Sequence, residues 1–255
     1  MNLYKEHRIN PGKPEMVLLH GWGMSSRVWG DFAEALAPFF SLTLIDLPGL
    51  GRSNDYPDPY TSDAVVDWVL ADAPEKAIWV GWSLGGQIAT LIAARYPARV
   101  DKLVTIASNP CFVARDDWEC AMDEQTHQQF ESGLAQSPAK TLSRFAMLQT
   151  QGALESKITL KHLKAVLSEE KPVALQQSLG LLREDVRPEF AKLTQPVLQL
   201  LGERDLLVPA GVAETCLAPE ECTAKVYPES GHLPFYSHQQ QVVNDILSFV
   251  NGQTL

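Results

Sequence analysis

The first half of the chain alternates short, continuously apolar runs with segments that carry helical signals. The apolar runs are "MVLLH" (16–20), "LTLID" (42–46), "AIWVGW" (77–82) and "LVTIA" (103–107). A run that is apolar at every position is typical of a strand buried on both faces of a parallel sheet. The intervening segments 25–39, 61–74 and 84–97 end at or near a proline and are predicted helices. Strands that alternate with helices predict βαβ units, and therefore an α/β fold with a mostly parallel central sheet.

This alternation stops at about residue 110 and resumes near residue 189. The intervening part has no convincing strand, and its segments 141–150, 158–170 and 172–185 have the pattern of amphipathic helices. After it come a strand at 196–202, a helix near 209–218, a short strand at 224–228 and a last helix around 238–251. We therefore expect an α/β core made of 1–109 and 189–255, with 110–188 inserted as a helical cap over a site. Two packed domains are the alternative.

Composition limits the function classes. The 255 residues are 45% hydrophobic and 20% charged, which suits one α/β domain with a sizeable core. The formal net charge of -10 repels nucleic acid and anionic membranes, so neither is an expected partner. The N-terminus lacks the apolar stretch of a signal peptide, and no apolar run approaches the length of a membrane span.

The cysteines indicate the compartment. Cys111, Cys120, Cys216 and Cys222 form no C-x-x-C pair and have no neighbours at metal-ligand spacing. Free thiols in a reducing cytoplasm are the simplest interpretation. No exposed strand or large apolar patch demands a dimer, so we expect a monomer.

The hexapeptide "GWSLGG" (81–86) follows the predicted strand 77–82 directly and opens a predicted helix. The pattern G-x-S-x-G is weak by itself, but on a strand-to-helix turn it is typical of a nucleophile elbow. Gly81 and Gly85 permit the close backbone packing that such a turn needs. Ser83 is therefore a predicted nucleophile, and it needs a base because a serine hydroxyl alone is weakly nucleophilic.

His232 is the predicted base. It lies in "SGHLPF", late in the chain, where the order Ser, then Asp or Glu, then His places it. We expect a structural role for His20 at the end of the first buried strand, and solvated surface for the remaining four histidines, which are His7, His127, His162 and His238.

Asp205 is the predicted partner of His232. It follows the strand 196–202, and sites in open parallel sheets gather at the carboxyl ends of strands. Glu203 and Asp185 are rival carboxylates, and Asp205 could instead cap the following turn. Two backbone N–H groups, those of Trp22 in the H-G-x-G loop 20–23 and of Leu84, are the predicted oxyanion hole. Such a site needs no metal and no cofactor.

The chain resembles the α/β-hydrolase superfamily over essentially its whole length. The runs "LLHGWG", "DLPGLGRS", "KAIWVGWSLGG", "VTIASNPCFVARDDW" and "RFAMLQTQG" are similar to the family of pimeloyl-acyl-carrier-protein methyl ester esterases of biotin synthesis. That resemblance implies a triad of Ser83, Asp205 and His232, with Trp22 and Leu84 at the oxyanion site. It also implies hydrolysis of a methyl ester on an acyl carrier protein. The residues implied to contact the acyl chain are Phe145, Ala146, Met147, Leu148 and Gln149.

The predicted cap is locally basic in an acidic protein. Lys140 and Arg144 are spaced i, i+4, as are Lys157 and Lys161, so each pair shares a helix face. From the residues alone this is a solvated helix face. With the resemblance, it is the expected docking patch for an acidic acyl carrier protein. Lysine keeps the positive charge but lacks the bidentate phosphate geometry of arginine.

Other functions compete with this interpretation. A general short-chain carboxylesterase and a carbon–carbon bond hydrolase use the same triad, and a non-catalytic binding protein could use the same scaffold. The intact triad argues against the binding protein. The basic cap favours a carrier-borne ester over a small neutral one, because a small neutral ester needs no basic surface.

Overall fold

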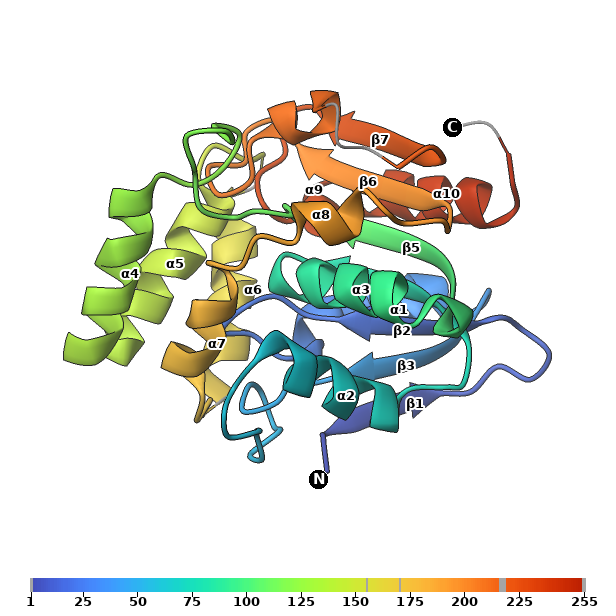
Figure 1. Cartoon of the computed structure of the whole chain (residues 1–255), viewed down its shortest axis with the longest axis horizontal. Helices are drawn as coiled ribbons and strands as arrows, with labels where there is room; N and C mark the ends of the chain where they lie inside the picture. Colours follow the sequence, from blue (N-terminus) through green and yellow to red (C-terminus); the bar gives the residue numbers. More distant parts are fainter. Residues whose placement is uncertain (1, 155, 170, 216–218, 254–255) are drawn as a thin grey trace.

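The computed structural model describes residues 2–154, 156–169, 171–215 and 219–253, and these form one seven-stranded sheet (Figure 1). Its strands, in spatial order, are β1 (Lys5–Arg8), β3 (Ser41–Ile45), β2 (Glu15–Leu19), β4 (Ala77–Trp82), β5 (Val100–Ile106), β6 (Val197–Gly202) and β7 (Cys222–Tyr227). β1 pairs antiparallel with β3, and the other neighbours are parallel. The predicted α/β class and mostly parallel sheet are confirmed.

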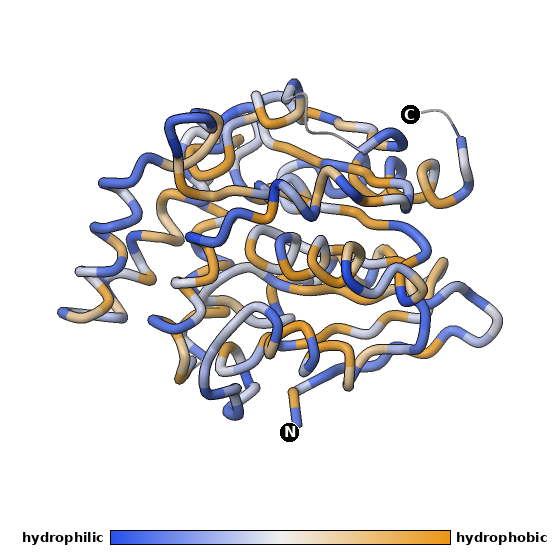
Figure 2. Tube along the Cα trace, in the orientation of Figure 1, coloured by the Kyte–Doolittle hydropathy of each residue, from blue (hydrophilic) through white to orange (hydrophobic). Residues whose placement is uncertain are grey.

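Helices cover both faces of this sheet. Alternate residues of β2 separate into two apolar clusters, with Val17 and Leu19 in one and Met16 and Leu18 in the other. The first cluster is completed by α2 (Ser62–Asp72), α3 (Leu84–Arg95) and α8 (Arg187–Phe190). The second is completed by α1 (Gly30–Leu36), α9 (Pro234–Ser237) and α10 (Gln239–Val250). Figure 2 shows the resulting apolar interior along the central strands.

Four helices from the part of the chain between β5 and β6 lie beside one end of the sheet (Figure 1). They are α4 (Glu124–Gln136), α5 (Pro138–Thr150), α6 (Ser156–Glu169) and α7 (Leu175–Leu181). We call residues 110–188 the cap. Residues from the start of α5, the end of α6 and the start of α7 lie together at one end of the cap.

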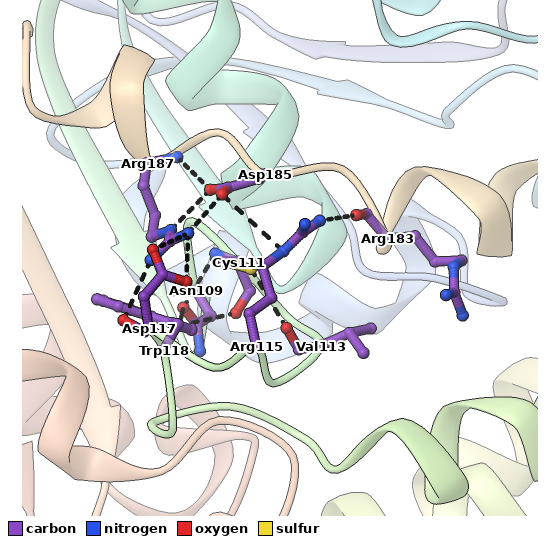
Figure 3. A network of polar contacts seen from close by, with 9 residues as sticks. All are labelled: Asn109, Cys111, Val113, Arg115, Asp117, Trp118, Arg183, Asp185 and Arg187. Atoms are coloured by element: carbon purple, nitrogen blue, oxygen red, sulfur yellow. Dashed lines mark hydrogen bonds and ion pairs between the residues drawn. The ribbon is translucent and has the colours of Figure 1, made fainter.

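The two chain segments that join the cap to the core are tied together. The Val186 N–H donates to the Pro110 carbonyl at 2.8 Å, and Cys111 bridges Asp185 in antiparallel fashion. Figure 3 shows the surrounding network, in which Arg187 binds the carboxylates of Asp185 and Asp117. This network fixes the base of the cap against the core.

Several elements differ from the sequence prediction. β1 was not predicted, because it is a four-residue polar edge strand, and neither was the polar helix α4. Segment 25–39 divides into a 3-10 turn, Ser26–Trp29, and α1. The predicted helix 209–218 is a 3-10 turn over Ala210–Glu214, and residues 216–218, with Cys216, lie outside the described part of the chain. Among the described helices, none is long and apolar enough to cross a bilayer.

The prediction that His127 is solvated surface is wrong. His127 lies on the inner face of α4 with Phe130 and Leu134, at helical spacing, and its side chain is fully buried. Burial lowers the pKa of His127, which keeps the imidazole neutral inside the cap. A histidine in a polar helical sequence can thus belong to the apolar side of that helix.

Candidate active site

Ser83 lies on a strained turn between β4 and α3. Its φ of 54° and ψ of -120° are unusual for a residue with a side chain, and its N–H donates to the Ile106 carbonyl at 2.9 Å. A Cβ added at Gly81 would lie 2.3 Å from the Gly85 carbonyl oxygen, and one at Gly85 would lie 2.2 Å from the Leu19 carbonyl oxygen. Both positions therefore require glycine, and the local geometry is that of the predicted elbow.

Asp205 and His232 form a buried pair in the loops after β6 and β7. The distance between His232 Nδ1 and Asp205 Oδ2 is 2.7 Å. The other carboxylate oxygen of Asp205 accepts the N–H groups of Leu207 at 2.8 Å and Val208 at 3.1 Å. These donors hold the carboxylate in one orientation, so Asp205 can fix both the ring orientation and the tautomer of His232.

His232 is held beside the elbow by two further hydrogen bonds. The indole N–H of Trp82, the residue before Ser83, donates to the His232 carbonyl at 2.8 Å. The His232 N–H donates to the Gln149 carbonyl in the cap at 3.0 Å. His232 Nε2 is buried and has no hydrogen-bond partner among the described residues, Ser83 Oγ included. Such contacts commonly tighten only when a reactant is bound.

The loop 20–23 packs directly against Ser83. A Cβ added at Gly21 would lie 3.2 Å from Ser83 Cβ, so this loop closely approaches Ser83. Leu84 is the first residue of α3, and its N–H therefore has no acceptor within that helix. His20 supports the loop: Nδ1 lies 2.8 Å from the Gly21 carbonyl oxygen, and Nε2 accepts the Leu47 N–H at 2.9 Å.

The inner face of α5 covers this site. The Phe145 ring meets the Trp22 ring edge to face, with centroids 4.9 Å apart, and Ala146 is buried beside it. Gln149 is buried, and both polar atoms of its amide lack a hydrogen-bond partner among the described residues. A buried amide without partners marks a place where water or a reactant can bind.

Met147 is not brought to the site. It is 52% exposed on the outer face of α5, away from the residues that this helix packs over Ser83, so its contact with the acyl chain stays a prediction. The inner face is formed by residues at i, i+3 and i+4 relative to one another, and position 147 lies opposite them. Leu148 is half-buried against the core.

The two rival carboxylates are engaged elsewhere. Glu203 accepts the N–H of Glu229 at 2.9 Å, and Asp185 binds Arg187 at the base of the cap. Asp205 is the one of these three that meets His232. The hydrogen bond from Trp82 to the His232 carbonyl had no signal in the sequence, because it joins positions 150 residues apart.

No group of three or more His, Cys, Asp or Glu side chains suited to hold a metal ion occurs within the described parts of the chain. Cys111, Cys120 and Cys222 are free thiols in this structure.

Comparison with known proteins identifies the family. The model of the alpha/beta hydrolase family matches residues 16–246. A protein of Pectobacterium atrosepticum named pimeloyl-[acyl-carrier protein] methyl ester esterase is 41% identical over 94% of this chain and 96% of its own length. One of the same name from Edwardsiella ictaluri is 40% identical over 98% of both chains.

Solved structures show the same fold at lower identity. An esterase from Exiguobacterium antarcticum superposes with a TM-score of 0.84 at 22% identity, covering 98% of this chain and 95% of that one. A bromoperoxidase from Bacillus anthracis superposes with a TM-score of 0.85 at 20% identity, with the same coverage. The chain therefore belongs to the alpha/beta hydrolase family and, within it, to the group of pimeloyl-[acyl-carrier protein] methyl ester esterases.

Proposed function

We propose that this protein is a serine carboxylesterase that hydrolyses the methyl ester of pimeloyl-acyl carrier protein, releasing methanol, in biotin synthesis. The observation that carries the chemistry is the buried Asp205–His232 pair, held beside the strained turn at Ser83. The substrate is the one named for relatives about 40% identical over nearly the whole chain.

The proposed reaction has two steps. His232 Nε2 takes the proton of Ser83 Oγ as that oxygen attacks the ester carbonyl, and the N–H groups of Trp22 and Leu84 bind the developing oxyanion. His232 then gives the proton to the departing methoxide, and an acyl-enzyme remains. Water, deprotonated by His232, attacks the acyl-enzyme and restores Ser83, leaving the free carboxylate. The buried amide of Gln149 is a binding partner for that water or for methanol.

We assign carrier docking to the outer side of the cap. Lys140, Arg144, Lys157 and Lys161 are all exposed, on the neighbouring helices α5 and α6. Exposed cations attract an acidic partner at long range and raise its association rate. We propose the carrier protein as this partner, and a cytoplasmic monomer as the form of the enzyme that meets it.

Charge reversal tests the docking patch. Changing Lys140, Arg144, Lys157 and Lys161 together to glutamate is expected to lower kcat/KM for the carrier-borne ester by about 100-fold, because electrostatic steering is reversed. Turnover of p-nitrophenyl acetate should stay within about twofold, since a neutral ester is not steered. Steady-state kinetics on both substrates at low and high salt measure this, and salt should weaken wild-type carrier turnover in the same direction.

A matched control separates local from global charge. The double variant Lys13→Glu and Lys192→Glu changes two exposed lysines outside the cap and alters net charge as much as reversing Lys140 and Arg144. The cap pair should impair carrier turnover and the control pair should not. Equal loss on carrier-borne and free esters would remove the docking assignment.

A further inference from the structure

A groove lies at the end of the cap where the start of α5, the end of α6 and the segment before α7 meet. It encloses about 390 Å³. Its lining is mainly apolar, with one cation at the rim, and includes Pro138, Leu142, Leu167, Pro172, Leu175 and Lys164. A groove of this size and composition is suited to an apolar chain.

The floor of the groove rests on the loop 20–23, which includes the proposed oxyanion donor Trp22. A Cβ added at Gly23 would lie 2.6 Å from Leu142 Cδ2 and 3.9 Å from Leu175 Cδ2. The neighbouring Trp22 donates its indole N–H to the Leu175 carbonyl at 3.0 Å. Leu142 and Leu175 therefore separate the groove from the loop that packs against Ser83.

Ser83 and His232 are almost fully covered in this conformation. The exposed fraction is 3% for Ser83 and 1% for His232, so we expect part of the cover to move when a long acyl chain enters. None of the residues that line the groove belongs to the network in Figure 3, which ties the cap to the core. The route by which a substrate enters therefore depends on which other contacts fix the cap to the core.

Backbone hydrogen bonds hold the cap at two further places. At the far end of α5, Gln149 accepts the His232 N–H, and the Leu154 N–H donates to the Glu229 carbonyl. Before α7, the N–H groups of Val173 and Ala174 donate to the Gly49 carbonyl. Leu142 covers Gly23 through its side chain, so rotation of that side chain opens the floor while these backbone bonds stay intact.

The cations of α6 lead to this groove. Lys157, Lys161 and Lys164 are spaced i, i+4 and i+7, lie on one helix face and are all exposed. The first two belong to the proposed docking patch, and the third lines the groove. A carrier protein bound on that face would present its phosphate-bearing arm, with the acyl chain at its end, close to Lys164.

We infer that this groove is the entrance for the arm and acyl chain of a carrier-borne ester, with Leu142 as its gate and Lys164 as a contact for the phosphate of the arm. The inference rests on the proposed function for the identity of the occupant. The steric part does not: any ester with a long acyl chain should pass the same gate.

The test fills the groove by two routes. Leu142→Trp blocks the floor, and Ser143→Trp fills the space from the half-buried rim without touching the contact with Gly23. Each variant should lower kcat/KM for p-nitrophenyl hexanoate by about 30-fold, because tryptophan fills the apolar space that the acyl chain needs. The loss for p-nitrophenyl acetate, whose acyl group is much shorter, should be only about threefold. The control is Leu154→Trp at an exposed leucine beyond the other end of α5, which should leave both esters unchanged.

Lys164→Glu tests the phosphate contact. It should lower kcat/KM for the methyl-pimeloyl carrier protein by a larger factor than kcat/KM for p-nitrophenyl hexanoate, because the hexanoate ester carries no phosphate. Hexanoate turnover that survives both tryptophan variants, or a loss equal for both chain lengths, would overturn the entrance. Failure of the proposed function looks different: the wild-type enzyme would ignore the carrier-borne ester while the chain-length dependence of the tryptophan variants persists.

Discussion

Replacing Ser83 with alanine is expected to lower kcat for p-nitrophenyl acetate by about five to six orders of magnitude, because the acyl-enzyme can no longer form. Alanine removes only the hydroxyl, so the strained turn and the fold should remain. A circular dichroism spectrum and a melting curve beside the kinetics check this separation.

Ser108 provides the matched control. It is also buried, and its hydroxyl donates to the Ser83 carbonyl at 2.8 Å, directly behind the elbow. Ser108→Ala removes one hydroxyl of the same kind and should cost less than about tenfold in kcat, since it loses one supporting hydrogen bond of about 1 kcal/mol. Esterase activity that persists in Ser83→Ala would exclude Ser83 as the nucleophile.

Replacing Asp205 with asparagine is expected to lower kcat by about 10⁴-fold, as loss of the orienting carboxylate does in serine hydrolysis generally. One oxygen of Asp205 accepts two backbone N–H groups and the other binds His232 Nδ1. An amide can place an acceptor on only one of these sides, so the variant either loses the backbone bonds or presents a donor to Nδ1. In the second case the imidazole adopts the wrong tautomer, with Nδ1 unprotonated.

The rival carboxylates serve as controls for this variant. Glu203→Gln and Asp185→Asn should leave kcat for p-nitrophenyl acetate within about threefold, because neither contacts His232. A large loss in Glu203→Gln with a small one in Asp205→Asn would reassign the orienting group.

The parts of the fold that the sequence predicted are those with a strong local signal. β2 to β6 are mostly apolar because both faces of the sheet are covered, and the helices after them carry caps, prolines or helical spacing. The tight turn at Ser83 also has a strong local signal, the glycines at 81 and 85. Glycine is needed there because neighbouring backbone atoms leave no space for a Cβ. The approach of Asp205 to His232 followed from their positions at strand ends.

The parts that the sequence did not predict depend on tertiary contacts. β1 is polar, and its strand conformation follows from pairing with β3 at the edge of the sheet. α4 has few apolar residues, and its inner face is completed by a neutral histidine that only the cap packing reveals. The exposure of Met147 and the contact of Leu142 with Gly23 depend on how α5 is rotated over the core, which periodicity alone does not determine.

The most direct test of the central claim is hydrolysis of the proposed substrate itself. Purified enzyme is incubated with methyl-pimeloyl carrier protein and, separately, with free dimethyl pimelate, each beside the Ser83→Ala variant, and loss of the methyl group is followed by mass. We expect rapid demethylation of the carrier-borne ester, much slower cleavage of the free ester, an intact thioester, and no reaction in the variant. Equal or faster cleavage of the free ester would contradict the carrier-borne substrate and leave a general carboxylesterase with a solvated basic cap.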